Sequence, residues 1–336
     1  MTSANDDAES LTVEVPGSSN GTLRKERDNA VEDGVDVIDN PSGVTLNAVG
    51  SNLPAFETVD INEPYLGGEP MHFGEDVERE SLVQILKTLT QEEKVSMNDI
   101  TMPIRHLRAE KGSVPKAVAK IRETLAWRRD FDVARVRKGM HGDDTEMREI
   151  LLRENETGKI YCRGFDAQGR ALMYMRPSRE NTNNELNNMR HLVWSLEKAI
   201  ACTRRKSVEL GATVPLEKIN LVIDYDGFQM RHAPPMSTSR YTLDILQKHY
   251  PERMYRAYVV HPPFVFRTFW MLVRPFVDPT TKEKICFCSG KKGIQKLTSA
   301  VTDVHKLEPC AGGETPMRDF DSKEYMTLPL NHGFDE

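Results

Sequence analysis

The chain has 336 residues, of which 38% are hydrophobic and 29% charged, and its formal net charge is −6. With a mean hydropathy of −0.53, this composition is typical of a protein that folds in water and excludes a class built on membrane-spanning segments. The longest nearly apolar stretch, residues 264–276, has 13 residues, whereas a helix needs about 20 to cross a bilayer.

Charge is unevenly distributed along the chain. Residues 1–75 carry 15 acidic and 3 basic side chains, whereas residues 76–336 carry 36 acidic and 42 basic ones. The first segment is rich in Asp, Glu, Asn, Gly, Ser and Pro, and its apolar residues follow no sustained period. Such a composition cannot bury enough surface to order itself. We therefore expect residues 1–75 to be a disordered acidic tail.

The start of the chain and its cysteines indicate a reducing compartment. Met1 is followed by TSANDDAES, which lacks the basic start and the apolar run of a secretory signal. The five cysteines are scattered and form no CxxC pair; they are Cys162, Cys202, Cys286, Cys288 and Cys310. Reduced thiols are therefore expected rather than a disulfide framework, and the protein is expected to be cytoplasmic.

Residues 78–140 are predicted to form a helical N-terminal lobe. The apolar residues within 82–89 and again within 114–125 recur at intervals of three and four. This spacing places them on one face of an amphipathic helix. Two or more helices should therefore pack together in this region.

Residues 145–313 alternate between short β-rich runs and longer helical ones, which indicates an α/β domain with a mixed or parallel sheet. The runs at 160–163 and 171–175 flank the turn at 166–169 and predict a hairpin. Further strands are expected at 219–225, 257–260 and 284–287, and helices at 186–200, 237–249 and 294–304. The strand at 219–225 is apolar on both faces, as in a covered central strand. Residues 314–336 are expected to be a C-terminal tail.

Sequence signatures of enzymes are lacking. No GxGxxG, GxxxxGK[ST] or HExxH motif occurs in the chain, and its GxSxG match, Gly17-Ser18-Ser19-Asn20-Gly21, lies in the acidic tail and not at a turn between a strand and a helix, which favours a protein that is not an enzyme. Cys286 and Cys288 fall on one face of a strand near His261, but a structural zinc site needs four ligands, so a packed pair of small apolar side chains is the simpler interpretation. No metal and no cofactor are expected.

A haem site is a further alternative. His232 could ligate haem inside an apolar pocket, with Tyr225 or Tyr241 as a second ligand. Lone His and Tyr residues are more often ordinary core or surface residues.

The stretch 264–276 is the most informative physical feature, because a helix formed by it is apolar on every side. Such a helix is either buried or in contact with lipid. A central core helix is one interpretation. Arg267 and Arg274 lie seven residues apart, on one face and among aromatic residues, which favours a lid with one side on an apolar cavity and the other near an anionic interface.

Several segments resemble a known family when taken in order. They are Trp127-Arg128-Arg129 before Phe131, GKIYCRGFDAQGRALMYMRPSRENT, INLVIDYDGF, Tyr250-Pro251-Glu252-Arg253-Met254 followed by AYVVHPP, the Phe-rich stretch, and Phe276-Val277-Asp278-Pro279-Thr280-Thr281. About residues 80–313 resemble the CRAL-TRIO lipid-binding proteins, the family of the yeast phosphatidylinositol/phosphatidylcholine transfer protein. The acidic tail has no part in the resemblance.

The resemblance implies a helical N-terminal lobe and a mixed β-sheet that floors an apolar lipid pocket closed by a helical gate. The gate residues would be Phe264, Phe266, Phe269, Trp270 and Phe276. The resemblance also implies that the lipid headgroup is held by Glu252, Thr281 and Lys284, with Lys111 from the N-terminal lobe. Glu110 stands where the family has a basic residue, and its carboxylate would repel a phosphate.

The function implied by the resemblance is uptake of one phospholipid, phosphatidylinositol or phosphatidylcholine, and its exchange at a membrane. The expected partners are the phospholipid, a transient membrane surface and, as a candidate, a lipid kinase or another protein; no nucleic acid is expected. One alternative is a scaffold that presents lipid to a partner. Another is a carrier of a sterol, a tocopherol-like molecule or haem, in which Glu252, Thr281 and Lys284 would be idle. On their own, Glu252 and Arg253 could also be an intradomain ion pair.

Overall fold

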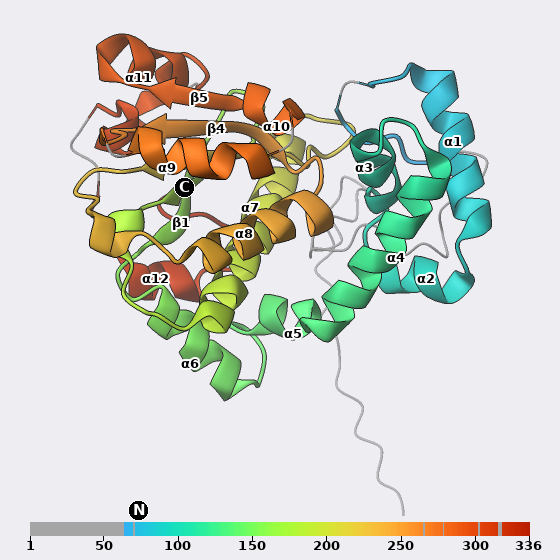
Figure 1. Cartoon of the computed structure of the whole chain (residues 1–336), viewed down its shortest axis with the longest axis horizontal. Helices are drawn as coiled ribbons and strands as arrows, with labels where there is room; N and C mark the ends of the chain where they lie inside the picture. The colour runs from blue at the N-terminus through green and yellow to red at the C-terminus, as the bar shows by residue number, and fades with distance from the viewer. Residues whose placement is uncertain (1–63, 70, 265, 278, 302, 315–317) are drawn as a thin grey trace, which may run out of the picture. The chain divides into compact units, whose positions relative to one another are not determined.

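The computed structural model describes residues 64–69, 71–264, 266–277, 279–301, 303–314 and 318–336 (Figure 1). Most of the predicted acidic tail, up to residue 63, lies outside the described residues. The last part of that tail is described, and it is packed: Tyr65 and Leu66 lie against the core of the helical lobe. Tyr65 and Leu66, which the composition assigned to the tail, therefore take part in the packing of the helical lobe.

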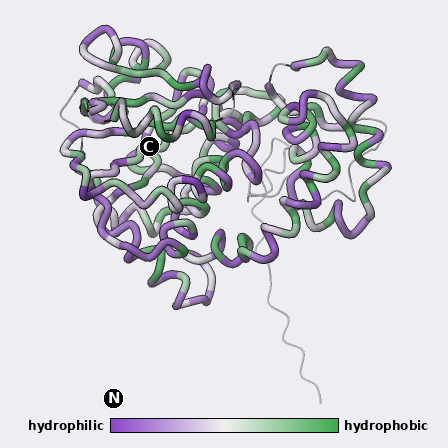
Figure 2. Tube along the Cα trace, viewed as in Figure 1, coloured by the Kyte–Doolittle hydropathy of each residue, from purple (hydrophilic) through white to green (hydrophobic). Residues whose placement is uncertain are grey.

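The helical lobe consists of short helices around a core of its own. They are α1 (Glu75–Thr88), α2 (Gln91–Met97), α3 (Met102–Ala109) and α4 (Val114–Asp130). Helix α5 (Val133–Lys138) follows, and its Val133 and Val136 are buried in the core of the α/β domain instead. The start of α2 is set by a capping box, in which Thr90 Oγ1 accepts from the Glu93 amide and Glu93 accepts from the Thr90 amide. Leu82, Ile85 and Ile121, predicted from helical spacing, are fully buried in this core, and Figure 2 shows the alternation of hydrophobic and hydrophilic residues along these helices.

The α/β domain follows the predicted alternation of strands and helices. Its strands are β1 (Ile160–Phe165), β2 (Ala171–Met175), β3 (Ile219–Asp224), β4 (Met254–Val260) and β5 (Ile285–Cys288), and its helices are α6 (Thr145–Glu154), α7 (Glu185–Glu209), α8 (Met236–Asp244), α9 (Phe266–Val273), α10 (Pro279–Glu283), α11 (Gly290–Thr298) and α12 (Ser322–Thr327). A π-helical turn, Ile245–His249, extends α8. Short 3₁₀ turns lie at Pro177–Arg179, Met230–His232, Arg274–Phe276, Val304–Lys306 and Pro309–Ala311.

The sheet is mixed, as predicted. Its described strands lie in the order β1-β2-β3-β4-β5. The β1–β2 hairpin is antiparallel, and β2 to β5 are parallel neighbours. Parallel strands require crossovers, which α7, α8 and α9 with α10 provide. The central position of β3 explains why the 219–225 run is apolar on both faces.

One face of the sheet is apolar across its parallel strands. The register aligns Met173, Leu221, Ala257 and Ile285 in one row, and the next row on that face is Met175, Ile223, Val259 and Phe287. Phe287 contacts Phe266 and Trp270 of α9, with ring centroids 6.0 and 5.8 Å apart. This apolar face is therefore the one that α9 covers.

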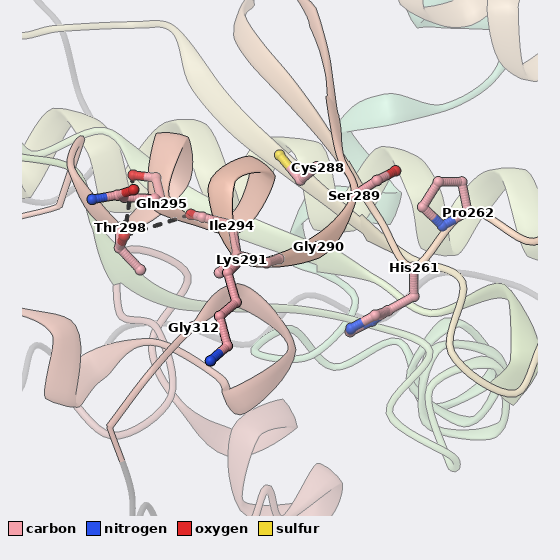
Figure 3. Close-up of a pocket in the computed structure, with 10 residues that line it drawn as sticks. All are labelled: His261, Pro262, Cys288, Ser289, Gly290, Lys291, Ile294, Gln295, Thr298 and Gly312. Atoms are coloured by element: carbon pink, nitrogen blue, oxygen red, sulfur yellow. Dashed lines mark hydrogen bonds between the residues drawn. The ribbon is translucent and has the colours of Figure 1, made fainter.

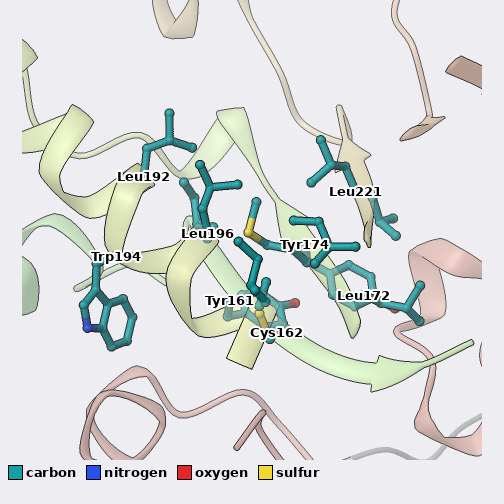
Figure 4. Packing of buried hydrophobic residues seen from close by; sticks show 14 of the residues in the cluster. Tyr161, Cys162, Leu172, Tyr174, Leu192, Trp194, Leu196 and Leu221 are labelled. Carbon is teal, nitrogen blue, oxygen red and sulfur yellow. The ribbon is translucent and has the colours of Figure 1, made fainter. Parts of the chain in front are cut away.

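The core of the α/β domain lies between the sheet and α7. Leu192 and Leu196 of α7 are buried in the same cluster as Cys162 of the hairpin (Figure 4). Trp194, on the same helix, is also fully buried. The helix is held by apolar packing rather than by its own propensity, which is the usual situation for amphipathic helices in domains.

The last residues of the chain belong to the fold. Tyr325 and Phe334 have no exposed surface. The Tyr325 hydroxyl accepts a hydrogen bond from the Cys162 amide at 3.0 Å, and the Phe334 amide donates to the Cys162 carbonyl at 2.8 Å. Residues 318–336, expected as a tail, therefore cover β1 and satisfy its backbone groups. Sequence spacing did not reveal this, because α12 is too short to show a helical period.

The predicted helix 294–304 ends earlier than its apolar spacing suggests. Helix α11 stops at Thr298. The Ala300 carbonyl then accepts a hydrogen bond from the Ala167 amide in the β1–β2 turn, at 3.0 Å. Val301 and Val304 still pack against the core, but from a loop and a 3₁₀ turn.

A buried histidine in α7 predicts a pH-dependent stability. His191 is fully buried, and burial and the charge of Lys159 hold its pKa well below the ordinary value. Below about pH 6.5 the unfolded chain binds a proton there that the folded chain does not, so the free energy of unfolding should fall by up to about 1.4 kcal/mol per pH unit. In His191→Leu this fall between pH 7.5 and pH 5 should be smaller, as measured by urea unfolding.

The control for this prediction is His305→Leu, because His305 is exposed. It should leave the pH dependence of unfolding unchanged. An unchanged dependence in His191→Leu as well would contradict the assignment.

Candidate functional site

Three charged residues gather at the amino ends of adjacent parallel strands. Lys218 immediately precedes β3, Glu252 lies two residues before β4, and Lys284 immediately precedes β5. The amino ends of parallel strands meet at one edge of a sheet, so the three side chains converge although they are far apart in the chain. We call Lys218, Glu252 and Lys284 the amino-end cluster.

Glu252 is the centre of the amino-end cluster. Its Oε2 atom lies 3.2 Å from Lys284 Nζ and 3.6 Å from Lys218 Nζ. Glu252 has a left-handed backbone conformation, φ +57°, which is uncommon for a residue with a side chain. Burial raises the pKa of its carboxyl, but Lys284 and Lys218 lower it by more, so the pKa lies below its usual value. The carboxylate is therefore charged near neutral pH.

The other predicted headgroup residues are Thr281 and Lys111. Thr281 lies in α10, where its carbonyl accepts a hydrogen bond from the Lys284 amide at 3.1 Å. Lys111 is exposed, in the turn after α3, and makes no ion pair with any described residue. Glu110, the departure from the family pattern, is the C-cap of α3. The roles of Thr281 and Lys111 stay predictions.

Glu252 and Arg253 are not an ion pair with each other. Arg253 turns to the helical lobe and lies 2.8 Å from Asp99 and 3.1 Å from Glu217. Arg105 and Arg204 also contact Asp99, at 2.6 and 3.3 Å. We call Asp99, Arg105, Arg204, Glu217 and Arg253 the interlobe cluster, because it joins the helical lobe to α7, β3 and β4. Arg253 therefore has a structural role, and Glu252 forms ion pairs with Lys284 and Lys218 instead.

The stretch 264–276 forms α9 and the 3₁₀ turn Arg274–Phe276. Phe266 is buried against Tyr225 and Phe287, with ring centroids 4.7 and 6.0 Å apart. Several other apolar side chains of this stretch are exposed: Phe264 by 86%, Met271 by 65%, Leu272 by 56% and Phe276 by 45%. The side chains of Arg267 and Phe269 lie outside the described ones. One side of the helix therefore contacts the sheet, while the other presents apolar groups to solvent.

A cavity lies at the carboxyl ends of β4 and β5. It has a volume of about 570 Å³ and is lined by residues that follow β4 and β5, among them His261, Pro262, Ser289 and Lys291. Figure 3 shows His261 and Lys291 extending from two neighbouring segments. His261 Nδ1 lies 3.0 Å from Asp224 Oδ1, at the carboxyl end of β3. This cavity and the amino-end cluster are at opposite ends of β4.

The residues considered for a metal or a haem site have the following surroundings. Among the described residues, no group of three or more His, Cys, Asp or Glu side chains could hold a metal ion. Cys288 is buried and Cys286 is half-buried, as free thiols. The His232 Nδ1 atom accepts a hydrogen bond from the Gln229 amide at 3.0 Å, within its own turn.

Two parts of the amino-end region were missed by sequence reasoning. Lys218 was not singled out, although a basic residue directly before an apolar parallel strand is a usable signal once the strand order is known. Residues 64–69 were assigned to the tail, yet Gly67, Gly68 and Glu69 line a small cavity together with Lys218 and Glu252. Neither could be found from spacing, because the contacts are long-range.

Comparison with known proteins agrees with this architecture. Residues 155–308 match the family model of the CRAL/TRIO domain. The crystal structure of Sfh5 superimposes with a TM-score of 0.50 at 20% sequence identity, covering 70% of this chain and 84% of that one. This likeness supports the fold alone. In the described part of the chain, no helix has the length and hydrophobicity needed to traverse a membrane.

Curated relatives share the same region. A CRAL-TRIO domain-containing protein of Schizosaccharomyces pombe is 37% identical over 184 residues, 55% of this chain and 16% of that protein. The phosphatidylinositol transfer protein PDR17 of Saccharomyces cerevisiae is 32% identical over 189 residues, 55% of this chain and 51% of PDR17. The matched region thus spans about half of one relative and a sixth of the other. The family model over residues 155–308 and these relatives therefore support the resemblance to the CRAL-TRIO family.

Proposed function

We propose that this protein takes up one phospholipid, phosphatidylinositol or phosphatidylcholine, and exchanges it at membranes without a covalent step. The observation that carries the proposal is the amino-end cluster, a carboxylate between two lysines at one end of an apolar sheet face. A relative that covers the same region is a phosphatidylinositol transfer protein. The protein would act from the cytoplasm and contact membranes transiently.

The amino-end cluster has the chemistry to hold an inositol phosphate headgroup. The ammonium group of Lys284 would neutralise the phosphate, and the Glu252 carboxylate would accept hydrogen bonds from inositol hydroxyls. Thr281, in the helix that leads to Lys284, would donate a further hydrogen bond. Choline has no hydroxyl groups and carries its own positive charge, so the same residues should contribute little to binding phosphatidylcholine.

The acyl chains would occupy space between the apolar sheet face and α9. Burial of acyl chains contributes about 0.8 kcal/mol per CH₂ group, so two long chains bind strongly with little help from the headgroup. Release then requires α9 to move at a membrane. The exposed apolar residues of α9 and the exposed Arg274 suit a helix that enters the interface of an anionic bilayer.

The test is the double variant Lys284→Ala with Glu252→Ala. It removes both partners of the 3.2 Å ion pair, so no unpaired charge remains in that pair. Transfer of phosphatidylinositol between vesicles should fall at least tenfold, since each charge-assisted hydrogen bond contributes about 1.5–3 kcal/mol. Transfer of phosphatidylcholine, measured in the same assay, should stay within about twofold.

The matched control removes an ion pair outside the site, Lys120→Ala with Glu123→Ala, whose atoms are 2.6 Å apart on the surface of α4. Neither lipid should be affected. An equal loss of both lipids in the site variant, with a lowered melting temperature, would show instead that Glu252 and Lys284 only stabilise the sheet edge.

A further inference from the structure

Lys218 is placed to serve the same site as Glu252 and Lys284. It precedes the strand on the other side of β4 from Lys284, and its side chain is only 12% exposed. Burial lowers its pKa, whereas the carboxylates of Glu69 and Glu252 act in the opposite direction. A buried lysine is costly unless anionic groups surround it. Lys218 therefore contacts the Glu252 carboxylate and lines the same small cavity as a second carboxylate, that of Glu69.

The second carboxylate comes from residues 64–69, which we call the strap. Its residue Glu69 is 8% exposed. One carboxylate oxygen, Oε2, lies 3.4 Å from Arg170 Nη2. The other oxygen, Oε1, is buried and has no hydrogen-bond partner among the described residues. A buried carboxylate oxygen without a partner is unfavourable, so Glu69 is held less well than the other buried carboxylates.

The strap is attached by a few contacts to the helical lobe and to the loop before β3. The Leu66 carbonyl accepts from Arg108 Nη2 at 3.1 Å, and the Tyr65 hydroxyl donates to the Pro215 carbonyl at 3.4 Å. Gly68 packs so closely that a Cβ atom there would lie 2.8 Å from the Val214 carbonyl oxygen. The strap therefore fits tightly over the site with few hydrogen bonds.

Little free space remains between the strap and the amino-end cluster. Gly67, Gly68 and Glu69 enclose a cavity of about 10 Å³ with Lys218 and Glu252. This is room for about one water molecule and not for a phosphate group. An anion that reached Lys218 from this side would have to move the strap.

We propose that Lys218 is a third headgroup-binding residue, and that the lipid phosphate takes the place of the Glu69 carboxylate beside it. The proposal rests on the proposed function and adds a residue and a competing internal anion to that site. Displacement exchanges one anion for another in the cavity that Lys218 lines. It breaks the contact between Glu69 and Arg170, which keeps its ion pair with Asp166, and it releases Glu69 from a position where one of its oxygens is unpaired. Phosphatidylinositol, whose headgroup is anionic, should use this exchange, and zwitterionic phosphatidylcholine should not.

The experiment measures the ratio of phosphatidylinositol to phosphatidylcholine that the full chain extracts from mixed vesicles, by mass spectrometry of the bound lipid. Lys218→Gln should lower this ratio at least tenfold, as expected for the loss of a charge-assisted contact, and Lys218→Arg should largely preserve it. Glu69→Gln should raise the ratio about fivefold or more, the effect of removing a competing ligand. Gly68→Ala, which pushes the strap outward, should act in the same direction.

A double-mutant cycle separates a local role of Glu69 from a general charge effect. If Glu69 competes at Lys218, Glu69→Gln should raise the ratio in the wild-type chain and not in Lys218→Gln. An equal rise in both backgrounds would overturn the proposal, as would an unchanged ratio in Glu69→Gln. The measurement on Glu69→Gln alone would overturn the proposal in this way even if Lys218→Gln fails to fold. The variants Lys120→Gln and Glu123→Gln, in an exposed pair on α4, are the controls for charge.

Two further outcomes have distinct meanings. If the wild-type chain extracts neither phospholipid, the proposed function itself fails. If it extracts phosphatidylinositol and Lys218→Gln does so equally well, only the present proposal fails.

Glycerophosphoinositol, which has the same phosphate without acyl chains, should compete at least a hundredfold more weakly than the intact lipid. Equal competition would overturn the assignment of the phosphate to a lipid.

Discussion

Replacing Asp99 by alanine should lower the free energy of unfolding by about 3–5 kcal/mol, the usual effect of removing one partner from a buried ionic group. Asp99 contacts Arg105, Arg204 and Arg253 within 3.3 Å. Without it, these three guanidinium groups would share Glu217 as their carboxylate in the interlobe cluster. The loss is large because the arginines are at most 19% exposed and cannot recover their hydration.

The position of Asp99 between α2 and α3 makes the effect global. Its partners lie on α3, on α7 and directly before β4, so one carboxylate joins the helical lobe to the sheet. The pKa of Asp99 is raised by burial but lowered much further by the arginines, so it lies well below the ordinary value. Its contribution to stability is therefore present above about pH 4, the pKa in the unfolded chain, and is lost as pH falls toward the folded-state pKa.

Urea unfolding followed by circular dichroism measures this prediction. Asp130→Ala is the matched control, because Asp130 pairs with Arg129 at 3.1 Å but the two side chains are 68% and 77% exposed; it should change stability by less than about 1 kcal/mol. Asp99→Ala within that same range would mean that the interlobe cluster contributes no net stability.

Lipid exchange should fall at least tenfold in Leu272→Asp while the fold is retained. Leu272 is 56% exposed on α9, so a carboxylate there remains in water when the protein is free. At a membrane the same carboxylate would have to enter the interface, which is unfavourable for a charged group. The defect should therefore appear in exchange and not in thermal unfolding.

Leu210→Asp provides a closely matched control. Leu210 is 55% exposed and lies at the end of α7. The two leucines therefore have nearly the same exposure but lie on different helices. Leu210→Asp should leave vesicle-to-vesicle transfer of phosphatidylcholine unchanged. A normal transfer rate in folded Leu272→Asp would show that the exposed side of α9 does not enter the membrane, and the gate assignment would be withdrawn.

The strands and main helices could be predicted because their signals are local. The alternation of short β-rich runs with helical periods indicated a mixed sheet, and the turn at 166–169 indicated the hairpin; the structure confirms both. The helix at 294–304 was predicted too long, because a hydrogen bond from Ala167 to Ala300 outweighs apolar spacing. The packing of residues 318–336 was not predicted, because a helix of 6 residues shows no period.

Some residues of the candidate site could likewise be predicted from the sequence, and their contacts could not. Glu252 and Lys284 could be named from the resemblance, which depends on a run of consecutive residues. Their pairing, and the assignment of Arg253 to Asp99 and Glu217 rather than to Glu252, required the strand order and the position of the helical lobe. Lys111 was carried over by a match in sequence, yet it lies in an exposed turn without an ion pair among the described residues.

The sequence by itself therefore determined the α/β class, the helical lobe and the apolar helix at 264–276, since hydrophobic period and turn residues act over a few positions. Tertiary structure alone decided which charges meet. Lys218, Glu252 and Lys284 are separated by at least 32 residues and converge only because β3, β4 and β5 are parallel neighbours. Glu69 reaches the same place only because the strap packs between the lobe and the sheet. Contacts of this kind depend on chain topology, which leaves no local pattern in the sequence.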